Sequence, residues 1–372
     1  LRWHHSMMVE EAWMALEFAN YYGLDPAPSI PLAEAVVKFY DEHFRRERLK
    51  EKGKELDDKG RLVIYPVNGL ELLGGATNPV EVVAGLHRIV DRVLSLPESS
   101  VPKETREFFM KVKPTLPDLP VSGSTVEDKI LLPAAGWEAQ YNKDEFNESY
   151  TLFPYRVTGV TEPDTLPMMR NTWKNIPADR AEHCKQDISW QPTLSAVALM
   201  GMTDEAHFYL LNKWSDSGRR QRFPAFFGPG HDWIPDHNWG GSGMVGLQSM
   251  LMAADGKKII LFPAWPANWD VDFKLHAPDQ TTVECQFRDG KIQRLDVIPE
   301  SRRKDVEIHQ PVILKDLSVP PKPDIHLSDL PSLKMENGNG HTAPNRSIGG
   351  SPLRVAGETY SKGLGCHARS LA

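Results

Sequence analysis

Hydrophobic residues recur every three or four positions along most of the first 262 residues, and this spacing predicts α-helices. The first buried stripe consists of Val9, Ala12, Trp13, Leu16 and Ala19. Gly23 follows it as a stop signal, because glycine readily adopts the left-handed backbone in which many helices end. We therefore predict a first helix that ends just before Gly23.

A signal for the start of a further helix lies at residues 78–81. Asn78 is the expected cap, Pro79 is in the first turn and Glu81 comes three residues after the cap. The stripe predicted to be buried behind it is Val82, Val83, Leu86, Ile89, Val90 and Val93. Three later stripes predict three more helices. They consist of Leu194, Val197, Ala198 and Met202 in the first, Phe208, Leu211 and Trp214 in the second, and Met244, Leu247, Met250 and Leu251 in the third.

These helices come in pairs that are separated by long loops rich in proline, glycine and tryptophan. Long loops inside a compact domain are usually functional. Paired helices with long loops at one end suit a toroid of helical hairpins, with the site at the loop end. The predicted fold class is therefore mainly α.

The pattern changes after Phe262. Residues 281–287 and 291–298 alternate or are β-branched, and Asp-Gly at 289–290 is a strong signal for a hairpin turn. We assign residues 263–317 to a small β-sandwich domain, which follows the helical segment 1–262. Residues 318–344, rich in Pro, Ser, Asn and Gly, are predicted to be a linker, and residues 345–372 resume a β-like pattern.

Composition narrows the class of protein. The chain has 372 residues, of which 40% are hydrophobic and 25% charged, as in a globular protein. Its net charge of −7, without a long basic block, makes nucleic acid or an anionic membrane an unexpected partner. No apolar stretch is long enough to span a bilayer. The three cysteines are scattered and form no CxxC pair, so we expect neither a disulfide framework, nor a metal site, nor a cofactor.

The strongest candidate for chemistry is the run at residues 233–241. It places Asp236, His237 and Asn238 between the indoles of Trp233 and Trp239, just before an apolar helix. Aromatic faces beside hydrogen-bonding groups suit a sugar, which offers C–H faces for stacking and hydroxyls for polar contacts. The alternative is a turn at the start of a helix, with Asp236 or Asn238 as its cap and the indoles packed in the core.

Three stretches together resemble the back half of the α-L-fucosidase-type glycoside hydrolases of family 95. They are Tyr-Pro-Val-Asn-Gly-Leu-Glu at 65–71 with Thr-Asn-Pro-Val at 77–80, Asp-His-Asn-Trp-Gly at 236–240, and Phe-Pro-Ala-Trp-Pro at 262–266 with the hairpin that follows. The loop at residues 148–156 is similar to one found in relatives of this family. The resemblance covers about two thirds of the chain.

This resemblance implies a partial (α/α)6 toroid that catalyses inverting hydrolysis of a terminal α-linked sugar of the L-fucose or L-galactose type. It implies that Glu71 is the general acid and that Asp236 assists the base, with the two carboxyls facing one pocket roughly 6.5–9.5 Å apart. The residues assigned to substrate binding are Asn68, Trp233, His237, Asn238, Trp239 and Glu148. Glu148 and Arg156 could each contact the substrate. The alternative for both is a buried structural ion pair.

The end of the chain is similar to the start of an NPCBM carbohydrate-binding module. The similarity rests on Asn-Arg-Ser-Ile-Gly-Gly at 345–350 and on the string from Gly357 to Ala368, which includes Tyr-Ser-Lys-Gly-Leu-Gly-Cys-His-Ala. The expected partner is thus an oligosaccharide or polysaccharide, and the expected location is extracellular or periplasmic. We also expect the chain to be a piece of a longer enzyme, with the base and any signal peptide before Leu1, and to be inactive by itself.

Two other functions stay open. A non-catalytic carbohydrate-binding protein would keep the fold and lose the chemistry, and Gly-Leu at 69–70, where the family more often has Ser-Pro, favours it. A phosphorylase or lyase on a similar toroid is the other. A phosphorylase needs a basic phosphate pocket near the acid, for which Arg170, Lys174 and Arg180 are the candidates.

Overall fold

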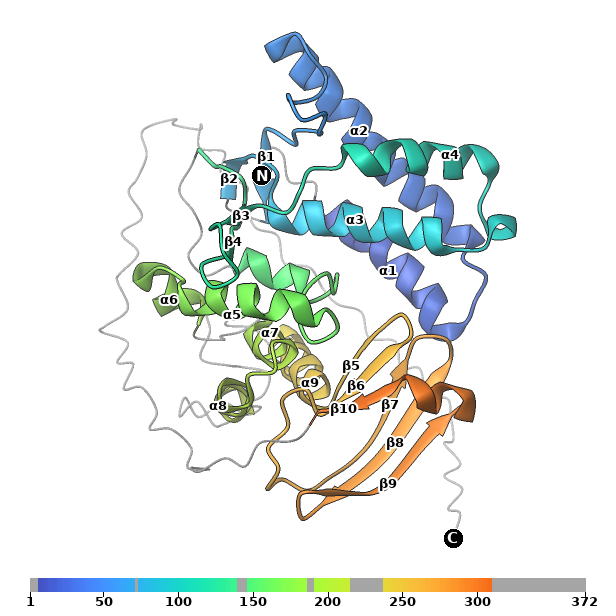
Figure 1. The fold of residues 1–372 in the computed structure, drawn as a ribbon, viewed down its shortest axis with the longest axis vertical. Coiled ribbons are helices and arrows are strands. Elements are labelled where there is room, and N and C mark those ends of the chain that lie inside the picture. The colour runs from blue at the N-terminus through green and yellow to red at the C-terminus, as the bar shows by residue number, and fades with distance from the viewer. Residues whose placement is uncertain (1–5, 71–72, 139–145, 186–190, 215–236, 310–372) are drawn as a thin grey trace, which may run out of the picture. The chain divides into compact units, whose positions relative to one another are not determined.

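The computed structural model describes residues 6–70, 73–138, 146–185, 191–214 and 237–309. About half of it is helical, and several small sheets accompany the helices (Figure 1). The described residues contain no closed barrel of helices. The prediction of a mainly α fold is therefore confirmed only in part, and the (α/α)6 toroid stays a prediction.

The helices fall into two groups along the chain. The helices of the first group are α1 (Ser6–Tyr22), α2 (Ile30–Lys52), α3 (Val80–Ser95) and α4 (Lys103–Val112). Those of the second group are α5 (Leu166–Lys174), α6 (Ala178–Cys184), α7 (Thr193–Leu199), α8 (Thr203–Trp214) and α9 (His237–Leu251). Each group is built around its own cluster of buried hydrophobic side chains.

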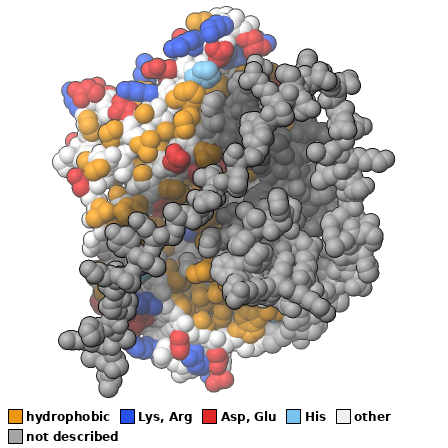
Figure 2. Space-filling view, turned by 180° about the vertical axis from the view of Figure 1, so that it is seen from behind, with side chains coloured by type: hydrophobic (Ala, Val, Ile, Leu, Met, Phe, Trp, Pro, Cys, Tyr) orange, Lys and Arg blue, Asp and Glu red, His pale blue; other side chains and the backbone are white. Residues whose placement is uncertain are grey.

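Helix α1 forms as its hydrophobic pattern predicts. All five residues of the predicted stripe are buried, and the helix ends at Tyr22, before Gly23 with its positive φ of 60°. The opposite side of α1 carries the exposed hydrophobic side chains Met7, Met14, Phe18 and Tyr22. Figure 2 shows hydrophobic side chains gathered on the face that is turned away from the viewer in Figure 1. Exposed stripes of this kind are typical of packing surfaces.

The start of α3 differs from its prediction. The helix begins at Val80, and the Asn78 side chain does not cap it but accepts a hydrogen bond from the Ile64 backbone N–H at 2.8 Å. Asn78 itself has a positive φ of 49°, which turns its side chain toward the preceding segment. The predicted apolar stripe of α3 is fully buried, and so is Glu81, the acid of the capping pattern.

Within the described residues, the strands pair in four small sheets. Two are short hairpins, β1 (Val67–Gly69) with β2 (Leu73–Ala76), and β3 (Val121–Ser122) with β4 (Ile130–Leu131). The larger sheets are β5 (Met252–Asp255), β6 (Lys258–Leu261) and β10 (Val306–Ile308), and β7 (Val271–Ala277), β8 (Thr281–Arg288) and β9 (Lys291–Ile298). The Asp289-Gly290 turn is confirmed between β8 and β9, and both residues have positive φ.

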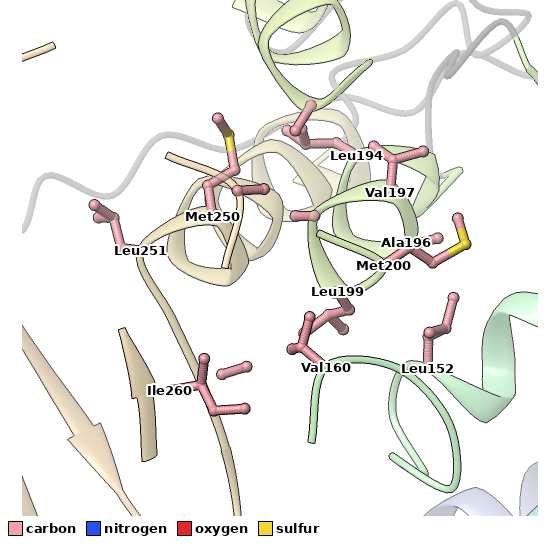
Figure 3. Close-up of a cluster of buried hydrophobic side chains, with 14 of the residues drawn as sticks. Leu152, Val160, Leu194, Ala196, Val197, Leu199, Met200, Met250, Leu251 and Ile260 are labelled. Carbon is pink, nitrogen blue, oxygen red and sulfur yellow. The ribbon is translucent and has the colours of Figure 1, made fainter. Parts of the chain in front are cut away.

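The second hydrophobic cluster joins α7 and α9 to the sheet that contains β6. Leu194 and Val197 of α7 lie near Met250 of α9, and Ile260 of β6 closes the cluster (Figure 3). Helix α8 shows the opposite face to the one its sequence suggests, because Phe208 and Trp214 are about 40% exposed. Its buried positions are Ala206, His207, Tyr209, Leu210 and Lys213.

The end of α1 is tied to the turn between β7 and β8. The backbone N–H groups of Asp279 and Gln280 donate to the carbonyls of Asn20 and Tyr21, at 3.1 and 3.2 Å. The Gln280 side-chain amide donates to the Tyr22 carbonyl at 2.8 Å. The last carbonyls of α1, which have no partner inside the helix, are thus satisfied by a segment more than 250 residues away in sequence.

Gly246 of α9 is where α7 and α9 cross most closely. A Cβ at this position would lie 2.9 Å from the Leu194 Cβ and inside the contact distance of the rest of that buried side chain. We expect Gly246→Ala to lower the free energy of unfolding by about 1–3 kcal/mol, the usual cost of overpacking a core.

Gly241→Ala in the same helix is the matched control, because a Cβ there meets nothing within 4 Å. It should raise stability by about 0.5–1 kcal/mol through the better helix propensity of alanine. Chemical denaturation of both variants measures the difference, and equal effects would contradict this packing.

Glu17 of α1 provides a prediction about pH. Burial raises the pKa of this carboxyl above the ordinary value of 4.5, although Arg92 and a hydrogen bond from Asn20 act in the other direction. As the pH rises past 4.5, the unfolded chain ionises before the folded one, so the folded state loses stability until its own raised pKa is passed.

Glu17→Gln should therefore raise the melting temperature at pH 7, and this gain should vanish near pH 4, where both states carry the protonated acid. Thermal unfolding at the two pH values checks this. Glu11→Gln, at an exposed position of the same helix, should change the melting temperature little at either pH. A gain for Glu17→Gln that is equal at both pH values would show that ionisation is not its cause.

Candidate functional site

The predicted general acid follows in sequence after β1 of the β1–β2 hairpin. Asn68 is half-buried on β1, and Glu71 lies outside the described residues, directly after Leu70. Leu70 has a positive φ of 43°, which is unusual for a leucine, and its backbone N–H donates to the Glu81 carboxylate at 2.8 Å. The backbone that leads into Glu71 is therefore held in a fixed conformation by Glu81 of α3.

Glu81 is buried, with 1% of its surface exposed. Gly69 lets the carboxylate approach the hairpin, because a Cβ at this position would lie 3.2 Å from Glu81 Oε1 and 2.9 Å from the Leu73 side chain. On the other side lies the buried hydroxyl of Tyr40, whose pKa is raised by burial and further by the charge of Glu81. This role of Glu81 was not predicted, although an acid within an apolar helical stripe is a signal that could have indicated it.

A third segment, residues 135–138, runs along β2. The Ala135 N–H donates to the Thr77 carbonyl and the Thr77 N–H to the Gly136 carbonyl, both at 2.8 Å. The Glu138 N–H donates to the Gly74 carbonyl at 3.2 Å. These bonds place residues 137 and 138 beside the β1–β2 hairpin.

The surface of this region combines aromatic and acidic side chains. The Tyr65 hydroxyl donates a hydrogen bond to the exposed carboxylate of Glu138, and this bond raises the pKa of the phenol. A Cβ on Gly75 would lie 3.0 Å from the Glu138 Cβ, so glycine makes room for the acid. Trp137 is 45% exposed. Exposed indole, phenol and carboxylate groups are suited to contact sugars, because one part is apolar and the other forms hydrogen bonds.

Glu148 lies at a separate, buried place in a short 3₁₀ segment (Asn147–Thr151). Its two carboxylate oxygens accept hydrogen bonds from Arg180 Nη1 and Nη2 at 2.8 and 2.6 Å, and the guanidinium is 5.8 Å from the Phe146 ring centre. The buried ion pair that the sequence left open as an alternative is thus present. Its partner is Arg180 and not Arg156.

The motif at residues 233–241 is only partly described. Trp233 and Asp236 lie outside the described residues, as do the side chains of His237, Asn238 and Trp239. Helix α9 begins at His237, so Asn238 is inside the helix and does not occupy the position of its cap. The expected approach of Asp236 to Glu71 stays a prediction.

Two thiols among the described residues offer no nucleophile. Cys184 and Cys285 are both buried, and burial raises the pKa of each thiol to about 11. Both are therefore protonated at neutral pH. In the described part of the chain, no three His, Cys, Asp or Glu side chains are grouped so that they could hold a metal ion. No helix of that part is both long and apolar enough to cross a membrane.

Comparison with known proteins bears on the end of the chain. Residues 323–372 match the NPCBM/NEW2 domain, a carbohydrate-binding domain, and this match begins within the stretch that the composition predicted to be a linker. No curated protein matches the chain. The match supports carbohydrate binding and a carbohydrate partner, and it confirms the resemblance seen at residues 345–368.

Proposed function

We propose that this protein acts on carbohydrates outside the cytoplasm. In this proposal the C-terminal module binds a glycan, and the helical part hydrolyses a terminal α-linked sugar of the L-fucose or L-galactose type with inversion. The observation that carries the carbohydrate assignment is the match of residues 323–372 to a carbohydrate-binding domain. Such modules increase the local concentration of substrate near a linked catalytic domain, which is the gain expected from tethering.

The geometry around the β1–β2 hairpin supports the hydrolytic part of the proposal. A general acid must be held in place, and the bond from the Leu70 N–H to buried Glu81 fixes the backbone next to Glu71. The neighbouring Tyr65, Trp137 and Glu138 supply the type of side chains that contact sugar rings and hydroxyls. Asp236 would then orient the attacking water, in an (α/α)6 toroid completed by further helices.

A non-catalytic carbohydrate-binding protein is the second candidate. The Gly-Leu pair at 69–70 favours it, because the positive φ of Leu70 and the approach of Glu81 to Gly69 build a hairpin that differs from the Ser-Pro form of the resembled family. Under this alternative, the surface around Trp137 would bind a sugar without cleaving it.

Assays on a panel of aryl glycosides and fucosylated oligosaccharides separate the two candidates. They use this chain and, if the protein extends beyond it, the full-length form. Release of aryl alcohol from an α-L-fucoside or α-L-galactoside, with the inverted sugar as first product by proton NMR, supports the hydrolase. Saturable binding without turnover in every form supports the non-catalytic protein. If neither is seen for any sugar of the panel, both proposals are wrong.

A further inference from the structure

A pocket of about 420 Å³ lies where α5, α8 and β10 meet, and residues of the β1–β2 hairpin do not line it. Its volume is in the range of small-molecule sites. Its described lining residues are Val160, Leu166, Arg170, Gly201, Thr203, Pro263, Ile308 and His309.

Arg170 is the charged group that distinguishes this pocket. Its Nε and Nη2 atoms both donate to the Met200 carbonyl, at 2.9 and 2.7 Å, so one edge of the guanidinium is fixed. The other edge, formed by Nη1 and the second Nη2 proton, is not used by these bonds. Among the described residues, no carboxylate pairs with Arg170, whereas the buried Arg180 and Arg302 pair with Glu148 and Asp279.

Gly201 makes this arrangement possible. It has a positive φ of 67°, and a Cβ at this position would lie 3.1 Å from Arg170 Nη2 and 3.4 Å from the Pro263 carbonyl. Any larger residue would be strained and would also push the guanidinium from its place. The chain therefore holds a cation rigidly at the wall of a pocket, and the free edge has the geometry that binds carboxylate or phosphate through two parallel hydrogen bonds.

The rest of the lining suits an anion that carries an apolar or C–H-rich body. Thr203 provides a hydroxyl, and His309 at the end of β10 provides an imidazole that is paired with Glu307 at 3.3 Å. Val160, Leu166, Pro263 and Ile308 provide the apolar wall. We propose that this pocket binds a small organic anion whose carboxylate or phosphate group pairs with Arg170.

Isothermal titration of the 372-residue chain with glucuronate, benzoate and inorganic phosphate tests this proposal, with glucose as the neutral control. We expect saturable binding of at least one of the three anions and none of glucose. The most effective probe then identifies the source of the charge, since glucuronate indicates an acidic sugar, benzoate a carboxylate on an apolar body, and phosphate a phosphate group. Absence of saturable binding for all three anions would overturn the proposal.

Variants assign the binding to this pocket. Arg170→Gln should lower the affinity for the anion by roughly 10- to 100-fold, because the charge-assisted hydrogen bonds are lost. Lys111→Gln removes an exposed positive charge from α4, a helix that does not line the pocket, and should leave the affinity unchanged. If Arg170→Gln does not fold, Ile308→Trp serves instead, because Ile308 lines the pocket and is 42% exposed, so that a larger side chain there should occupy the pocket. Affinity that survives both Arg170→Gln and Ile308→Trp, or that falls equally in Lys111→Gln, would place the anion elsewhere.

Discussion

Replacing Glu71 by glutamine is expected to lower turnover by roughly 10²–10⁴-fold in any form of the protein that hydrolyses an aryl α-L-fucoside, because a positioned general acid contributes about this factor. The amide keeps the shape of the side chain and cannot donate the proton. The loss should be much smaller for a glycosyl fluoride, whose leaving group needs no protonation. Steady-state kinetics on the two substrates give the comparison.

The matched control for this prediction is Glu138→Gln. Glu138 lies on the segment next to the hairpin, is exposed, and accepts the Tyr65 hydroxyl, which an amide oxygen can still do. We expect a change of less than about tenfold, because this side chain is not assigned to proton transfer. An equal loss on both substrates for Glu71→Gln would make Glu71 a structural residue.

Breaking the buried pair of Glu148 and Arg180 is expected to destabilise the second helical group strongly. Arg180→Met leaves the Glu148 carboxylate without its bidentate partner in a place that is 2% exposed. Removal of one partner of a buried ion pair typically costs about 3–5 kcal/mol, because the remaining charge keeps its desolvation penalty. Urea unfolding should show a loss of this size, with circular dichroism as the check that the variant still folds.

Two further variants distinguish a buried charge from lost packing. Glu148→Leu combined with Arg180→Met removes both charges and should be clearly more stable than Arg180→Met alone. Glu107→Gln breaks the exposed pair with Lys103 and should change stability by less than about 1 kcal/mol. If the double variant is as unstable as Arg180→Met, packing and not the orphaned charge explains the cost.

The candidate site was only partly visible in the sequence. The motif around Glu71 could be found because a carboxylate lay within a recognisable string, and the tail because its Tyr-Ser-Lys-Gly-Leu-Gly string is specific. The support of the hairpin by Glu81 was not predicted, because the same acid also fits a capping pattern and its hydrogen bond to Leu70 spans eleven positions. The partner of Glu148 was likewise hidden, because Arg180 is 32 residues away and nothing local selects it.

The sequence by itself determined the elements whose cause is local. The stripe of α1, its end before Gly23 and the Asp289-Gly290 turn all follow from periodicity and from backbone conformations that few residues adopt. Tertiary structure decided what depends on distant neighbours, namely the buried face of α8, the satisfaction of the end of α1 by the β7–β8 turn, and the burial of Glu81. The physical reason is that a helix of mixed polarity can present either face to the core, and the partners available in space select which one is buried.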